Sequence, residues 1–161
     1  TKAYTTRVGE GPFPTEMGGA EADALRERGG EFGVTTGRPR RCGWLDLVAI
    51  RHAVEINGVT EFALTKLDVL DGADEIKLCV AYQLEGKRID RFPLSADVLE
   101  KCTPIYESFD GWREDLTGIR TMEELPSAAH TYLERIETLT NTPVGILSIG
   151  PAPEQTIHRN T

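Results

Sequence analysis

Two short, mostly apolar segments constrain the fold of this chain more than any other feature. Residues 62–70 (FALTKLDVL) lie between a predicted helix and the turn residues Asp71 and Gly72, and residues 144–150 (VGILSIG) follow another predicted helix. Short apolar runs between amphipathic helices are typical of buried strands in a sheet covered by helices. The pattern therefore predicts an α/β fold in which each strand ends in polar or small residues.

The other elements follow from hydrophobic periodicity and turn residues. We expect a strand near 2–8, helices at 20–28, 45–57 and 95–101, the last begun by Ser95, and a longer helix with Pro126 as its first residue. Residues 76–84, Glu85-Gly86 and residues 87–92 predict an antiparallel β-hairpin. Residues 102–125 are expected to be irregular, and the polar tail from Ala152 to be partly ordered at best.

Composition bounds the class of protein. The chain has 161 residues and a net charge of −8. This length is enough for one domain with a core, and the acidic balance argues against binding to nucleic acid or to a membrane surface. No apolar run approaches the roughly 18–20 residues that span a bilayer. Cys42, Cys79 and Cys102 are widely spaced and are interpreted as reduced thiols of a cytosolic protein. The start at Thr1, inside a glycine- and proline-rich loop, suggests that the sequence is a piece of a longer chain.

The segment Glu31–Asp46 (EFGVTTGRPRRCGWLD) is a local basic exception on this acidic background. Its glycines let the backbone pass close to a ligand, and its threonines offer hydroxyl groups. Arg38, Arg40 and Arg41 offer forked donors that suit carboxylates and phosphates. One hypothesis is therefore a loop that holds a small anionic molecule, and the alternative is a solvated basic turn before a helix.

A second group of polar residues lies where the two apolar strands are predicted to end. An aspartate can accept both the ring N–H and the amino group of guanine, and a lysine stem can lie along the base. Lys66 and Asp68 follow the K-x-D part of the N-K-x-D sequence of GTP-binding proteins, with Thr65 in place of the asparagine. The turn Ser148–Gly150 resembles the additional guanine-contacting turn of such proteins. Both turns are expected along one edge of the sheet, where α/β proteins bind ligands.

The machinery for phosphate chemistry has no counterpart in the sequence. It contains no G-x-x-x-x-G-K-[ST] loop, no convincing general base and no evident magnesium site. A base-binding pocket without phosphate machinery indicates that part of an enzyme is absent.

Several blocks, in this order and spacing, resemble one known family. GPFPTE, VTTGRPRRCGWLD, LTKLDVLDG, IKLCVAYQL and SIGP look like the C-terminal portion, about the last third, of adenylosuccinate synthetase. The resemblance implies part of a sheet like that of P-loop NTPases. It also implies a cytoplasmic, homodimeric, Mg²⁺-requiring ligase of purine nucleotide (AMP) biosynthesis. Such an enzyme joins IMP and L-aspartate at the expense of GTP through a 6-phosphoryl-IMP intermediate.

The resemblance also implies roles for individual residues. Val34, Thr35, Thr36, Gly37 and Arg38 would form the aspartate-binding loop, with Arg38 also reaching the IMP ribose. Val8 and Gly9 would line the IMP site. Arg40 would contact GTP, and Lys66, Leu67, Asp68, Ser148, Ile149 and Gly150 would bind its guanine. Ile149 stands where the family commonly has threonine. The catalytic residues, the magnesium ligands and the N-terminal phosphate loop would lie outside these residues, so 1–161 is expected to be a single C-terminal fragment, inactive alone.

Two other classes of function remain open from the residues themselves. A non-catalytic GTP-binding regulatory module would use Lys66 and Asp68 but would have no need of the Thr-Thr-Gly-Arg loop. A purely structural domain would use its arginines at an oligomer interface.

Overall fold

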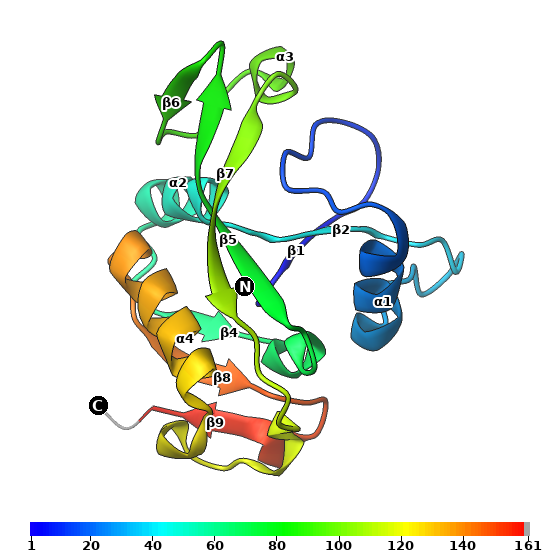
Figure 1. The fold of residues 1–161 in the computed structure, drawn as a ribbon, viewed down its shortest axis with the longest axis vertical. Helices are drawn as coiled ribbons and strands as arrows, with labels where there is room; N and C mark the ends of the chain where they lie inside the picture. Colours follow the sequence, from blue (N-terminus) through cyan, green and yellow to red (C-terminus); the bar gives the residue numbers. More distant parts are fainter. Residues whose placement is uncertain (160–161) are drawn as a thin grey trace. The chain divides into compact units, whose positions relative to one another are not determined.

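The computed structural model describes residues 1–159, which divide into two compact units (Figure 1). The first unit comprises residues 1–3, 50–76 and the described residues from 108 onward, and the second comprises residues 4–49 and 77–107. The described residues contain no helix that is long and apolar enough to cross a membrane.

A three-stranded sheet organises the first unit. Its strands are β4 (Phe62–Leu64), β8 (Val144–Ser148) and β9 (Thr156–His158), in the order β4-β8-β9. Strand β8 runs parallel to β4, with Leu64 opposite Leu147, and antiparallel to β9. The unit also holds α4 (Ser127–Thr140) and four short 3₁₀ helices, η1 (Leu67–Leu70), η2 (Leu116–Gly118), η3 (Met122–Glu124) and η4 (Pro153–Gln155).

The prediction of a strand over residues 62–70 was half right. The strand ends at Leu64, and the chain then turns at Lys66, whose φ of 63° lies in the left-handed region, into η1. The apolar residues Leu67, Val69 and Leu70 are buried on that 3₁₀ turn, so the sequence reads as apolar without being extended. The final strand was predicted correctly but ends at Ser148, and α4 begins one residue after Pro126, which occupies the N-cap.

Four strands were not predicted, two of them in the C-terminal half of the chain. Strand β7 (Thr103–Asp110) lies in the segment expected to be irregular and pairs with β5 (Glu75–Leu84). Strand β9 lies in the tail expected to be poorly ordered. Both strands are half-exposed and lack a clear apolar pattern in the sequence. Backbone pairing to a neighbouring strand, which the sequence does not reveal, holds them. Asn160 and Thr161, also part of that tail, lie outside the described residues.

Aromatic side chains form the core of the first unit beside the sheet. Tyr132 of α4 is fully buried and its hydroxyl donates to the Ala3 carbonyl at 2.8 Å. Its ring meets Phe109 edge-on, with centroids 6.0 Å apart. Trp112 is also buried, and its indole N–H donates to Asp71 at 2.6 Å. Each polar group that these rings carry inward is thereby satisfied.

The second unit is built from short strands and helices. It contains β1 (Thr5–Arg7), β2 (Arg41–Gly43), β3 (Leu45–Asp46), β6 (Lys87–Ile89), α1 (Gly19–Gly29) and α3 (Ala96–Leu99), and it shares α2 (Leu47–Asn57), β5 and β7 with the first. Strand β1 pairs antiparallel with β2, and β3 pairs parallel with β5. The predicted hairpin is confirmed: β5 and β6 pair antiparallel around Glu85 and Gly86, which both have positive φ.

A buried carboxylate sets the start of α2. The helix begins two residues later than predicted, because Leu45 and Asp46 form β3 instead. Asp46 then caps α2: its Oδ1 accepts the Val48 and Ala49 N–H groups, and its Oδ2 accepts the hydroxyl of Tyr82. Burial, together with the Asp46 charge, raises the pKa of Tyr82. Ser95, by contrast, occupies the N-cap of α3 without a side-chain hydrogen bond.

The three cysteines are all buried and unbridged. Two of them, Cys79 and Cys102, share a core cluster of the second unit with Val48, Tyr82 and Leu99. Buried cysteines of this kind pack as small apolar side chains. That they are reduced thiols of a cytosolic protein stays a prediction.

The central position of β8 gives a test of this fold. Leu147 is fully buried and pairs with both neighbouring strands. Leu147→Ala is therefore expected to destabilise the chain by about 2–5 kcal/mol. Ile56 is largely exposed, so Ile56→Ala is the control and should leave stability nearly unchanged. Urea unfolding followed by tryptophan fluorescence measures both, and equal midpoints for the two variants would contradict the register.

Candidate functional site

The structure brings the two predicted guanine-binding segments to the same edge of the first unit's sheet. Because β4 and β8 are parallel and pair Leu64 with Leu147, the segments that follow them leave at the same edge. Residues 66–68 follow β4, and residues 148–150 close β8. Polar turns beyond the carboxyl ends of parallel strands are where α/β proteins hold ligands.

At the end of β4, Leu67 is fully buried and anchors the turn that carries Lys66 and Asp68. The Asp68 side chain is partly buried, and its Oδ1 is covered yet accepts no hydrogen bond within the described residues. Burial raises the pKa of the Asp68 carboxyl, and Asp115 adds to this, whereas hydrogen bonding to its own backbone and the charge of Lys66 oppose it. A covered acceptor without a donor costs free energy that a donor from a ligand would recover.

At the end of β8, the turn is held from within the first unit. Ile149 is fully buried, its N–H donates to the Gln155 carbonyl at 3.0 Å, and the Ser148 hydroxyl donates to the Gly150 carbonyl at 3.0 Å. The N–H of Gly150 donates to no group of the described chain. Of the amides in this turn, the one at Gly150 is therefore available to an acceptor, while that of Ile149 is already used.

The predicted anion loop is a narrow excursion of the second unit. The Arg40 N–H donates to the Glu31 carbonyl and the Gly33 N–H to the Arg38 carbonyl, both at 2.8 Å, so that the two sides of the loop are joined. Gly37 has a φ of 64° and its N–H returns to the Gly33 carbonyl. The tip, residues 34–38, is exposed, with Val34 at 97%. The side chain of Arg38 makes no hydrogen bond or ion pair within the described chain.

The three arginines of this segment have different environments, which the sequence did not separate. Arg38 is exposed, whereas Arg40 donates from Nη1 to Glu31 at 2.9 Å and its side chain is 29% exposed. Arg41 donates two hydrogen bonds to the Glu16 carboxylate, from Nε at 2.8 Å and from Nη2 at 2.6 Å. This hydrogen bonding is the main reason that the pKa of Glu16 is lowered. Arg41 is therefore a structural residue rather than part of an open anion site.

Arg41 and Arg7 together hold the loop that contains Val8 and Gly9. Arg41 Nη1 donates to the carbonyls of Gly9 and Gly11, and Arg7 donates to those of Pro12 and Glu10 at 2.9 and 3.0 Å. Within this loop Val8 is 78% exposed and Gly9 has a φ of 81°. The predicted IMP-lining residues therefore lie on a loop that two guanidinium groups fix by its carbonyls.

Residues 8, 9, 34–38 and 40 belong to the second unit, and residues 66–68 and 148–150 to the first. Sequence reasoning missed the residues that support them. The buried Glu31 and Tyr4 and the turn-closing Gln155 carry no motif, and only the position of Glu31 at the head of the arginine-rich segment could have drawn attention to it.

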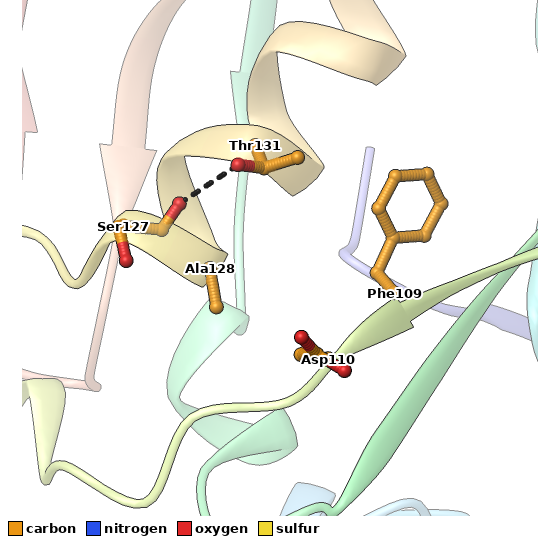
Figure 2. A pocket seen from close by; sticks show the side chains of 5 residues that line it. All are labelled: Phe109, Asp110, Ser127, Ala128 and Thr131. Atoms are coloured by element: carbon orange, nitrogen blue, oxygen red, sulfur yellow. Dashed lines mark hydrogen bonds between the residues drawn. The ribbon is translucent and has the colours of Figure 1, made fainter.

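Two hollows of the first unit contain none of the predicted residues. One, of about 180 Å³, is lined by Phe109 and Asp110 at the end of β7 and by Ser127, Ala128 and Thr131 of α4 (Figure 2). Figure 2 also shows the Thr131 hydroxyl donating to the Ser127 carbonyl, at 3.0 Å, so this hydroxyl is already used within the helix. The other, of about 190 Å³, lies between η3 and β9.

The fold is therefore a mixed α/β fold, in which two polar turns follow two parallel strands at the same edge of a sheet. The family profile described as adenylosuccinate synthetase matches residues 1–157. The chain belongs to the adenylosuccinate synthetase family.

Relatives from several organisms agree with this assignment. The adenylosuccinate synthetase of Moorella thermoacetica is 55% identical over 156 residues, which is 97% of this chain and 36% of that protein. The synthetase of Clostridium botulinum (strain Eklund 17B / Type B) is 54% identical over 157 residues, or 98% of this chain and 37% of that one. The fully ligated adenylosuccinate synthetase of Plasmodium falciparum superposes with a TM-score of 0.95 at 40% identity, and the match covers 99% of this chain and 38% of that one. The chain thus spans about a third of the length of the relatives it matches.

The raised pKa of Asp68 predicts a dependence of stability on pH. The folded chain binds this proton more tightly than the unfolded chain. The stability contribution is therefore complete below about pH 4 and is lost as the pH rises through the folded-state pKa. Asp68→Asn removes the ionisation, and we expect a higher melting temperature than the parent at neutral pH but not in strong acid.

Asp115 provides a control of opposite sign. Its pKa is lowered by the hydroxyl and the N–H of Thr117, so Asp115→Asn should lower the melting temperature at neutral pH. Thermal unfolding followed by circular dichroism measures both variants. An Asp68→Asn chain that melts below the parent at neutral pH would show that the Asp68 charge is already compensated.

Proposed function

We propose that this chain is the aspartate-, IMP- and guanine-binding part of a GTP-dependent ligase that forms adenylosuccinate from IMP and L-aspartate in AMP biosynthesis. Family membership over residues 1–157 supports the reaction. The observation that carries the guanine assignment is the covered Asp68 oxygen, which lacks a donor and lies at the same sheet edge as the unused Gly150 N–H.

Guanine has the complementary groups. Its ring N–H and amino group would both donate to the ionised Asp68, and its carbonyl oxygen would accept the Gly150 N–H. The stem of Lys66 would lie along the base, while Leu67, Ser148 and Ile149 hold the two turns in place. Because Ile149 contributes its buried side chain and its main chain to the turn, a hydroxyl is not needed there.

The exposed tip at residues 34–38 suits a second anion. Arg38 offers a planar pair of donors that matches a carboxylate of aspartate, and Thr36, with Val34, Thr35 and Gly37, would complete the loop around it. Arg38 would also reach the IMP ribose, and the loop carrying Val8 and Gly9 would line the IMP site. Arg40 would contact GTP and stabilise charge that develops on the transferring phosphoryl group, which passes through a 6-phosphoryl-IMP intermediate.

Mg²⁺ is the remaining requirement of such an enzyme. The described residues contain no group of three or more histidines, cysteines, aspartates or glutamates that could hold a metal ion. We propose no metal ligand and no catalytic residue within residues 1–161. We further propose that the full-length protein is a cytoplasmic homodimer and that the segment alone is inactive.

Exchanging the acceptor at position 68 tests the guanine assignment. In a full-length synthetase that carries this segment, Asp68→Asn replaces an acceptor by a donor. We expect kcat/KM to fall at least about tenfold for GTP and to rise for xanthosine triphosphate, whose ring carbonyl accepts from the new amide. Steady-state kinetics with each nucleotide measures the exchange. Asp74→Asn, which changes an exposed ion-pair partner, is the control, and unchanged kinetics with GTP in Asp68→Asn would refute the role of Asp68.

Inactivity of the isolated segment is tested separately. The 161-residue chain mixed with IMP, L-aspartate, GTP and Mg²⁺ should form no adenylosuccinate, while the full-length protein should turn over under the same conditions. Product formation by the segment alone would overturn this part of the proposal. If the full-length protein binds GTP but neither binds aspartate nor forms product, the chain is a regulatory GTP-binding module instead.

A further inference from the structure

A buried ion pair of the second unit, Glu31 with Arg40, lies at the base of the proposed substrate loop. Glu31 is fully buried, and both of its carboxylate oxygens are used. Oε1 accepts the Tyr4 hydroxyl at 2.6 Å, and Oε2 accepts Nη1 of Arg40 at 2.9 Å. A buried carboxylate without such partners would strongly destabilise the fold. The hydrogen bonds from Tyr4 and Arg40 to Glu31 are therefore required for stability.

The backbone around Arg40 is fixed by the same group of residues. The Arg40 N–H donates to the Glu31 carbonyl at 2.8 Å, and the Arg40 carbonyl accepts Nε of Arg26 from α1 at 3.0 Å. Glu31 itself is tied to α1, because its N–H donates to the Arg26 carbonyl at 2.9 Å. Main chain and guanidinium of Arg40 are therefore both held from the side of α1.

Close packing leaves little freedom in this arrangement. A Cβ at Gly29 would collide with the Tyr4 hydroxyl oxygen and would lie 3.2 Å from Cγ of Glu31. The last residue of α1 must therefore be glycine for tyrosine and glutamate to approach each other. Such contact restricts both side chains to one arrangement.

Only one edge of the Arg40 guanidinium is used in this way. Nη1 donates to Glu31, and Nε and Nη2 donate to no group of the described chain. With a side chain that is 29% exposed, the group is held at one end and open to solvent at the other. Arg40 thus combines a fixed position with unused donors, which is the state that preorganised recognition of an anion requires.

We propose that Glu31 and Tyr4 are positioning residues, which act through Arg40 to orient its free donors toward a phosphate group of the nucleotide substrate. This inference rests on the proposed contact of Arg40 with GTP. Tyr4 fixes the Glu31 carboxylate, Glu31 fixes one edge of the guanidinium, and the other edge binds the phosphate. The cost of ordering a long arginine side chain is then met on folding rather than on binding.

A matched pair of tyrosines separates this role from simple support of the fold. Tyr4 and Tyr82 are both buried, and each donates its hydroxyl to a buried carboxylate, Glu31 and Asp46 respectively. Asp46 accepts the first N–H groups of α2, whereas Glu31 accepts Arg40 of the proposed site. Tyr4→Phe and Tyr82→Phe therefore remove the same kind of hydrogen bond, and only the first lies behind Arg40.

The experiment uses a full-length synthetase that carries this segment, with Arg40→Gln as reference. We expect Arg40→Gln to lower kcat/KM for GTP at least about tenfold and Tyr4→Phe to lower it about three- to tenfold. Tyr82→Phe should leave kcat/KM for GTP within about twofold of the parent, although it lowers the melting temperature. The KM for aspartate should not change in Tyr4→Phe, because Arg38 and Thr36 are not held by Glu31. In Arg40→Gln, adding Tyr4→Phe should cause no further loss of kcat/KM.

Other outcomes of this experiment would contradict either the positioning role or the proposed function. Equal kinetic effects of Tyr4→Phe and Tyr82→Phe would reduce the network to fold support, and so would a full, additive loss in the double variant. If Arg40→Gln impairs the reaction with GTP while Tyr4→Phe and Glu31→Gln both remain at the parent value, the positioning role is wrong and the proposed function stands. If the parent shows no GTP-dependent ligation, or Arg40→Gln has no effect on it, the proposed function of Arg40 itself fails.

Discussion

The parallel pairing of β4 with β8 is the constraint on which the first unit depends. It joins segments that are far apart in sequence, with Phe62 opposite Val144 and Leu64 opposite Leu147. Non-local pairing of this kind costs chain entropy, and the buried Leu64, Leu147 and Tyr132 supply the apolar contacts that offset it. Parallel direction alone then sends both strand ends, with Lys66–Asp68 and Ser148–Gly150, to the same edge.

The second unit is organised by ion pairs instead. Arg41 with Glu16 ties the N-terminal loop to β2, and Arg40 with Glu31 ties the proposed substrate loop to α1. Both arginines come from one basic stretch, but the first pair is partly exposed and the second carboxylate is fully buried. Burial decides how much each pair contributes to stability. An exposed ion pair contributes about 0–1 kcal/mol, whereas breaking a buried pair destabilises a protein by about 3–5 kcal/mol. The arginines of this stretch look alike in the sequence. In the structure some of them hold carboxylates of the fold, while others keep donors that a ligand can use.

Sequence predicted the elements whose signals are local. The helices α1, α2 and α4, the hairpin at Glu85-Gly86 and the strand at 144–148 follow from periodicity and turn residues. It failed for β2, β3, β7 and β9, which are strands because β1, β5 and β8 lie beside them, and at Leu67–Leu70, where buried apolar residues form a 3₁₀ turn. For the candidate site, the residues that carry motifs could be named in advance. Glu31, Tyr4 and Gln155 could not, because their importance comes from burial and from partners distant in sequence.

Lys66 combines two demands on one position. Its positive φ places a residue with a Cβ in the left-handed region. That conformation carries a steric cost which glycine would avoid. Glycine there would relax the backbone, but it would also remove the stem proposed to lie along the base. Residue 66 is thus a position at which a more stable backbone and the proposed contact with the base favour different amino acids, so a redesign of this chain that selects for stability alone would remove that contact.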